Sequence, residues 1–171
     1  MPYSFEEWRV ISESLLESTK RELVGSEAIL SVAETLLTNL KFVDKNNCTY
    51  EQIQQKIEFV MGWLTGVGIS PTVVTLDALL SIACTQGTID DISQALLRYS
   101  TYNLSYSQYT FNTLLNRYAN DANTTAAFAL IDHMHSANVH SDITTLNTLI
   151  KLFIKVKNLT GIKRVSVLWF V

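Results

Sequence analysis

A short phrase recurs three times along this chain at a constant interval. VVTLDALL begins at Val73, QYTFNTLL at Gln108 and ITTLNTLI at Ile143, so each phrase starts 35 residues after the one before. A fixed internal period of this length is the signature of a repeat protein, in which each unit packs against its neighbours. The period therefore predicts stacked copies of one small unit.

Helix-capping residues at fixed positions inside each unit predict a helical hairpin. Residues that cap helix N-termini recur where a second helix would begin, at Thr88, Asn123 and Asn158. Residues that accept a left-handed backbone recur where that helix would end, at Gly68, Asn103 and Asn138. Apolar positions also keep the period, at Ile92, Ala127 and Ile162 and at Tyr99, Met134 and Trp169. One hairpin cannot bury both of its apolar faces alone, so the expected fold is all-α, an α-α solenoid of stacked helical hairpins with a 35-residue repeat.

The register divides the chain into unequal parts of one predicted solenoid, 1–171. It gives complete repeats at 73–107 and 108–142, a truncated repeat at 143–171, a partial repeat at 50–72 with a second helix only, and degenerate helices in 1–49. The third repeat should run to about position 177, which favours a fragment or a truncated reading frame. Helical faces in the first part are Phe5, Trp8, Ile11 and Leu15, then Ile29, Ala33, Leu36, Leu37 and Leu40, then Ile53, Ile57, Val60, Met61 and Leu64. No apolar run reaches the roughly 18 residues of a membrane span.

The stretch FNTLLNRYANDANTTAAFALIDHMHSANVHSD, Phe111 to Asp142, resembles the pentatricopeptide repeat along its full length. The resemblance covers 73–171 well, 50–72 as a second helix only and 1–49 weakly. It implies binding of single-stranded RNA, one base per repeat, mostly in mitochondria or chloroplasts. Partners implied are an organellar transcript and ribonucleoprotein or mitoribosomal proteins.

Polar residues four apart form stripes along the first helices. The stripes are Asn112, Asn116 and Asn120, then Asn147, Lys151 and Lys155, and on the preceding helix Asp77, Ser81 and Thr85. Side by side they would form a groove of amides, hydroxyls and ammonium groups suited to base edges and phosphates. The alternative is an ordinary solvated helix face.

The resemblance also implies roles for particular residues. In the family the fifth and last residues of a repeat read the base and the second packs against it. The implied reading pairs are Asp77 with Ser107 and Asn112 with Asp142, and Asn147 lacks a partner. The implied packing residues are Val74, Tyr109 and Thr144. Lys155 matches a position at which the family contacts phosphate, whereas Thr85 and Asn120 depart from that pattern. Asn112 with Asp142 resembles the family combination associated with uridine. The alternative for Thr72, Ser107 and Asp142 is that they only cap helices.

Charge argues against strong RNA binding by this chain alone. The net charge is −3, with 6 basic and 10 acidic residues in 1–70, 2 and 6 in 71–142, and 5 and 0 in 143–171. Affinity for nucleic acid rises with the number of phosphates neutralised, so the best repeats should bind weakly without further repeats or a partner. A protein-interaction scaffold within a ribonucleoprotein is therefore the competing hypothesis.

The sequence gives little support for other functions. His133 and His135 diverge on one helix, so no metal site is expected, and no phosphate loop or nucleophile motif indicates an enzyme, a cofactor or a small-molecule substrate. Cys48 and Cys84 are expected to be free thiols. The opening residues MPYSFEEWRV are acidic rather than Arg-rich, so the expectation of a mitochondrial location comes from the resemblance alone.

Overall fold

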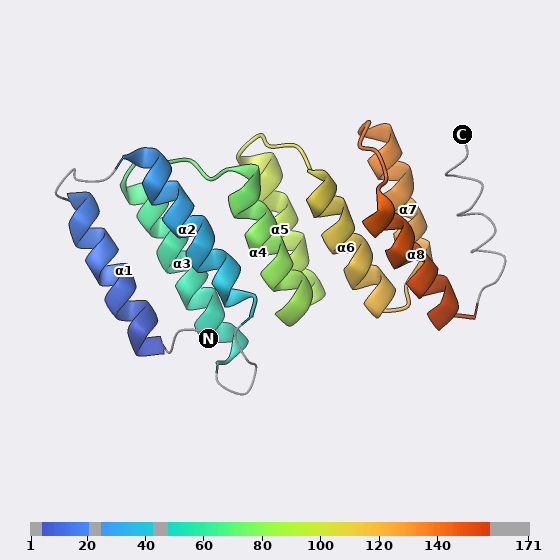
Figure 1. Cartoon of the computed structure of the whole chain (residues 1–171), viewed down its shortest axis with the longest axis horizontal. Helices are drawn as coiled ribbons and strands as arrows, with labels where there is room; N and C mark the ends of the chain where they lie inside the picture. The colour runs from blue at the N-terminus through green and yellow to red at the C-terminus, as the bar shows by residue number, and fades with distance from the viewer. Residues whose placement is uncertain (1–4, 21–24, 43–47, 158–171) are drawn as a thin grey trace. The chain divides into compact units, whose positions relative to one another are not determined.

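The computed structural model describes residues 5–20, 25–42 and 48–157, all of them helical or in short connections (Figure 1). These residues contain eight α-helices and no strand, which confirms the predicted all-α helical-repeat fold. The helices are α1 (Phe5–Lys20), α2 (Ser26–Leu40), α3 (Tyr50–Gly66), α4 (Val73–Gln86), α5 (Ile89–Thr101), α6 (Gln108–Asn120), α7 (Thr124–Ser136) and α8 (Ile143–Lys155). They fall into two compact units, Met1–Ser105 and Tyr106–Val171.

The helices begin at the residues whose side chains can cap them. The hydroxyl or carboxylate of the N-cap accepts the backbone N–H three residues later, at Thr49, Thr72, Thr88, Ser107 and Asp142. In each of these a side chain at that later position bonds back to the N-cap N–H, which completes a capping box. Asn123 caps α7 through the Ala126 N–H, whereas the predicted cap Asn158 lies outside the described residues.

The second helices end in the predicted left-handed turns. Gly68, Asn103 and Asn138 have φ of 72°, 53° and 55°. The N–H of the following apolar residue then reaches five residues back: Ile69 to the Leu64 carbonyl at 2.9 Å, Leu104 to Tyr99 at 2.8 Å and Val139 to Met134 at 3.0 Å. This is the Schellman motif, and it satisfies carbonyls that the end of a helix leaves without partners.

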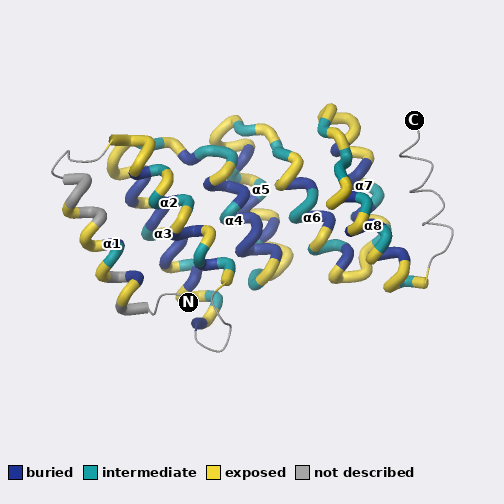
Figure 2. The backbone as a smooth tube through the Cα atoms, viewed as in Figure 1, coloured by how far each residue is buried: buried dark blue, intermediate teal, exposed yellow. Residues whose placement is uncertain are grey.

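In unit 1 the helices α2 to α5 each carry both buried and exposed residues (Figure 2). α4 packs against α5, and α2 packs against both α3 and α4. The predicted apolar faces of α2 and α3 are buried, with Lys56 and Trp63 of α3 buried beside them. On α1, Trp8 is buried with its ring 5.6 Å from Phe59, while the side chains of Phe5 and Leu15 lie outside the description.

α2 is the first helix of a hairpin with α3. The 35-residue register left the 50–72 repeat without one, because Glu34 lies 43 residues before Asp77 whereas Asp77 lies 35 before Asn112. The extra residues are taken up by the connection 41–49 and by α3, which has 17 residues against 13 in α5. Inserted residues in a connection leave helix packing intact, so the repeat survives a change in its length.

Unit 2 repeats this arrangement, with α6 packed against α7 and against α8. Its core is formed by buried residues of the three helices: Phe111, Leu114, Leu115, Ala127, Leu130, Ile131, Met134, Leu149, Leu152 and Phe153. The Phe128 and Phe153 rings lie 5.4 Å apart and join α7 to α8. The predicted large apolar position is buried at Tyr99 and Met134, and its third member, Trp169, lies outside the described residues.

Candidate functional site

The predicted reading pair of unit 2 is brought into contact by the packing of α6 against α8. Asn112 Nδ2 donates a hydrogen bond to Asp142 Oδ1 at 3.1 Å. Thr145 Oγ1 lies 2.7 Å from Asn112 Oδ1 and 2.9 Å from Asp142 Oδ1, so its single hydrogen can be donated to either oxygen. Asp142 and Thr145 lie 30 and 33 positions after Asn112 along the chain, and the three residues form one hydrogen-bonded cluster. We call Asn112, Asp142 and Thr145 the amide triad.

Asp142 is held as a carboxylate by hydrogen bonds at the start of α8. The Thr145 N–H donates to its Oδ1 at 2.8 Å. This bond lowers the pKa of Asp142 below its usual value; burial works against it, and hydrogen bonds from the Thr145 hydroxyl and the Asn112 amide support it. A carboxylate only accepts hydrogen bonds, so it fixes which end of the Asn112 amide faces it. The amide keeps one N–H and an oxygen lone pair with which to pair with a ligand.

The remaining predicted residues of α6 and α8 are exposed. Asn116 and Asn120 of α6 and Asn147, Lys151 and Lys155 of α8 are exposed, and so are the packing residues Tyr109 and Thr144. Lys155 Nζ donates to the Asn120 carbonyl at 2.6 Å, at the end of α6. An ammonium has three donors, so this bond leaves Lys155 able to contact a phosphate as well.

The α4 stripe of unit 1 differs, because its first two members are buried. Asp77 is 7% exposed and accepts a hydrogen bond from the Tyr99 hydroxyl at 2.6 Å. Ser81 is 3% exposed, whereas Thr85 and the packing residue Val74 are exposed. Ser107 lies in unit 2, where it caps α6, so its pairing with Asp77 stays a prediction.

A second cluster with the geometry of the amide triad lies in unit 1, and the 35-residue register missed it. Glu34 Oε1 of α2 accepts the Thr72 hydroxyl at 2.6 Å and the Thr75 hydroxyl at 3.2 Å. Thr72 is the N-cap of α4, as Asp142 is of α8, and Thr75 corresponds to Thr145. The available signal was the phrase Glu34-Thr-Leu-Leu, which matches Asn112-Thr-Leu-Leu once the longer 41–49 connection is allowed. We call Glu34, Thr72 and Thr75 the carboxylate triad.

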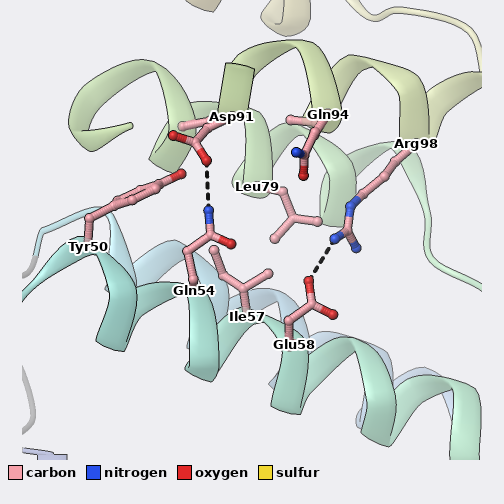
Figure 3. A pocket seen from close by; sticks show the side chains of 10 residues that line it. Tyr50, Gln54, Ile57, Glu58, Leu79, Asp91, Gln94 and Arg98 are labelled. Carbon is pink, nitrogen blue, oxygen red and sulfur yellow. Dashed lines mark hydrogen bonds and ion pairs between the residues drawn. The ribbon is translucent and has the colours of Figure 1, made fainter. Parts of the chain in front are cut away.

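The pocket between α3, α4 and α5 is too small to be a ligand site (Figure 3). Its volume is about 30 Å³, which is space for a water molecule or two. Gln54 and Arg98 donate across it to Asp91 and Glu58, at 2.9 and 2.8 Å. The pocket joins α3 to α5 through polar contacts and does not admit a base.

Other kinds of site find no support in the described part of the chain. No group of three or more His, Cys, Asp or Glu residues there could hold a metal ion. None of the helices described is long and apolar enough to cross a membrane. Cys48 and Cys84 are buried and form no disulfide, and the three histidines are exposed.

Stacked hairpins with capped first helices define this chain as a helical-repeat protein. Residues 107–155 match the family model of the PPR repeat family, which confirms the resemblance of the central repeat. The matched segment contains the whole amide triad. No curated protein matches the chain.

Proposed function

We propose that this chain is a sequence-dependent module that binds single-stranded RNA and reads a uridine through Asn112 and Asp142. The observation that carries the proposal is the amide triad, within a segment that matches the PPR repeat family. The match to this family across 107–155 supports an RNA-binding helical-repeat protein of a generally non-enzymatic kind. Single-stranded RNA exposes the Watson–Crick edges that such side chains can reach.

The fixed orientation of the Asn112 amide supports discrimination between the two pyrimidines. Uracil presents an N–H beside a carbonyl oxygen, whereas cytosine presents a ring nitrogen acceptor beside an amino group. An amide free to rotate could pair with either edge by exchanging its oxygen and nitrogen. Asp142 on one side and the Thr145 hydroxyl on the other oppose that exchange, so the amide can favour one pyrimidine.

Groups near the triad suit the rest of a nucleotide. Tyr109 and Thr144 are exposed near the starts of α6 and α8, where the ring of Tyr109 offers a stacking surface to a base. Lys151 and Lys155 are exposed on α8, at the positions predicted to approach phosphate. Affinity from so few cations should be low and strongly dependent on salt.

We infer further that the module acts in mitochondria on the stability, processing or translation of a transcript. Residues 71–142 hold 2 basic and 6 acidic residues, which favours a role beside further RNA-binding partners such as ribonucleoprotein or mitoribosomal proteins. The same acidity supports a second candidate function, a protein-interaction scaffold in such an assembly. The two differ in whether the isolated chain distinguishes bases.

Fluorescence anisotropy with short oligo(U), oligo(C), oligo(A) and oligo(G) at two salt concentrations tests the proposal. The chain should prefer oligo(U), and Asn112→Ala should reduce that preference by about fivefold or more, the effect of losing one base contact. Asn120→Ala removes an amide from the same helix outside the triad, and this variant should keep the preference for oligo(U). Absence of binding to any oligomer at low salt by a folded, helical chain would favour the scaffold.

A further inference from the structure

The carboxylate triad has the same construction as the amide triad but the opposite hydrogen-bonding character. In each, a half-buried side chain on a first helix lies between the N-cap of the next first helix and a buried threonine three residues beyond it. Asn112 faces a carboxylate and a hydroxyl, whereas Glu34 faces two hydroxyls. The polar end of Glu34 therefore occupies the place of the Asn112 amide.

The Glu34 side chain can offer a ligand only hydrogen-bond acceptors. Both threonine hydroxyls lie on Oε1, which leaves Oε2 available for a ligand. An ionised carboxylate has no hydrogen to donate, so its best partner is a group that only donates. Cytosine, adenine and guanine each carry an exocyclic amino group. Uracil carries none, and its one ring N–H on this edge lies between two carbonyl oxygens that a carboxylate repels.

We propose that α2 and α3 form a further base-reading repeat, in which Glu34 and Thr72 select a base with an exocyclic amino group and reject uracil. This inference rests on the proposed function, because it assigns a second nucleotide position to the same kind of interface. Glu34 Oε2 accepts a hydrogen bond from the amino group of the base. The Thr72 and Thr75 hydroxyls hold the carboxylate in position by donating to Oε1.

The orientation of the carboxylate is set by the fold. Thr72 is fixed by the capping box of α4, in which its Oγ1 accepts the Thr75 N–H at 3.3 Å. Thr75 is fully buried, so its hydroxyl cannot rotate into solvent. Glu34 is thereby positioned by two donors on a neighbouring helix, which distinguishes it from the exposed carboxylate Glu27 on the same helix.

Glu34→Gln in the full chain tests this inference with little disturbance of the fold. The glutamine keeps an oxygen for the two hydroxyls and replaces the second oxygen by an amide donor, which can pair with a uracil carbonyl. The ratio of affinities for oligo(U) and oligo(C) should rise by about fivefold or more. Glu27→Gln removes the same charge from α2 and should strengthen binding to both oligomers equally, without changing the ratio.

The Asn112→Ala variant separates failure of this inference from failure of the proposed function. A uridine preference that depends on Asn112, together with an unchanged U-to-C ratio in Glu34→Gln, would overturn the Glu34 assignment alone. An equal change of the U-to-C affinity ratio in Glu34→Gln and Glu27→Gln would also overturn it, by showing a general charge effect. If the folded parent chain binds none of the oligomers, both the proposed function and the Glu34 assignment are overturned. A thermal melt of Glu34→Gln matching that of Glu27→Gln would show that the two variants are equally folded.

Discussion

Two residues at the same repeat position, Asp77 and Asn112, have different hydrogen-bond partners. Asp77 is buried against the Tyr99 hydroxyl, whereas the position equivalent to Tyr99 in the next hairpin is Met134, which has no donor. Asn112 instead bonds to Asp142 and Thr145 on α8. A short hydrogen bond between a hydroxyl and a carboxyl group offsets the cost of burying the acid. The Tyr99 hydroxyl is therefore one of the groups that hold the Asp77 side chain in its buried position.

Tyr99→Phe should destabilise unit 1 by roughly 1–3 kcal/mol, because a buried carboxyl loses a hydrogen-bond donor while the ring still fills its place. The measurement is urea unfolding followed by circular dichroism. Tyr102→Phe is the matched control, since Tyr102 lies three residues away and is 36% exposed. Equal stabilities of the two variants would show that the Tyr99 hydroxyl contributes little.

At the scale of elements, most helix boundaries are set by groups within a few residues of each end. The capping box that starts α5 is also linked to α3: Asp91 bonds to the Thr88 N–H at 2.7 Å and to Gln54 at 2.9 Å. Although burial alone would raise the pKa of Asp91, the hydrogen bonds from Thr88, Tyr50 and Gln54 outweigh it and lower that pKa. One carboxylate thus joins a local cap to the packing of two helices.

The lowered pKa of Asp91 predicts part of the acid sensitivity of unit 1. A carboxyl group whose pKa is lower in the folded state adds stability above its unfolded pKa of about 3.9, and that stability is lost as pH falls through the folded value. Asp91→Asn should therefore lose less unfolding free energy between pH 7 and pH 3 than the parent chain. Urea unfolding at both pH values measures this. Asp90→Asn, on the adjacent exposed residue, should retain more of the parent's pH dependence.

At the scale of the whole molecule, positive charge is concentrated toward the C-terminal end of the sequence. Residues 143–171 contain 5 basic and no acidic residues, whereas 1–142 contain 8 basic and 16 acidic residues. Association with a polyanion should therefore depend on α8 and the residues after it. Base preference, in contrast, should depend on the triads, whose members form directed hydrogen bonds.

Lys151→Gln should weaken binding to all four oligomers by a similar factor and reduce the slope of log affinity against log salt by about one unit. The reason is that a phosphate contact carries no base information. Anisotropy titrations at several salt concentrations measure both quantities. A variant with an altered base preference and an unchanged salt slope would place Lys151 at a base rather than at a phosphate.

Much of the fold could be predicted from the sequence because its signals are local. An N-cap side chain bonds to an N–H three residues away, and a Schellman turn joins residues five apart. The register together with the family resemblance also implied Asn112 and Asp142 as a reading pair, whereas the hydrogen bond between them was found in the structure. A helix was predicted over Ile29–Leu40, but its pairing with α3 as the first helix of a repeat was not, because the longer 41–49 connection shifts Glu34 out of the 35-residue register although the packing is retained.

The sequence by itself determined the period, the helices with their caps and left-handed ends, and the charge of each segment. These depend on neighbours within one turn of helix or on composition alone. The tertiary structure decided which polar side chains face a partner: it buries Asp77 on Tyr99, 22 residues away, and sets Glu34 on Thr72, 38 residues away. Burial of a polar group depends on donors that a neighbouring helix supplies, and those donors are fixed only when the helices pack.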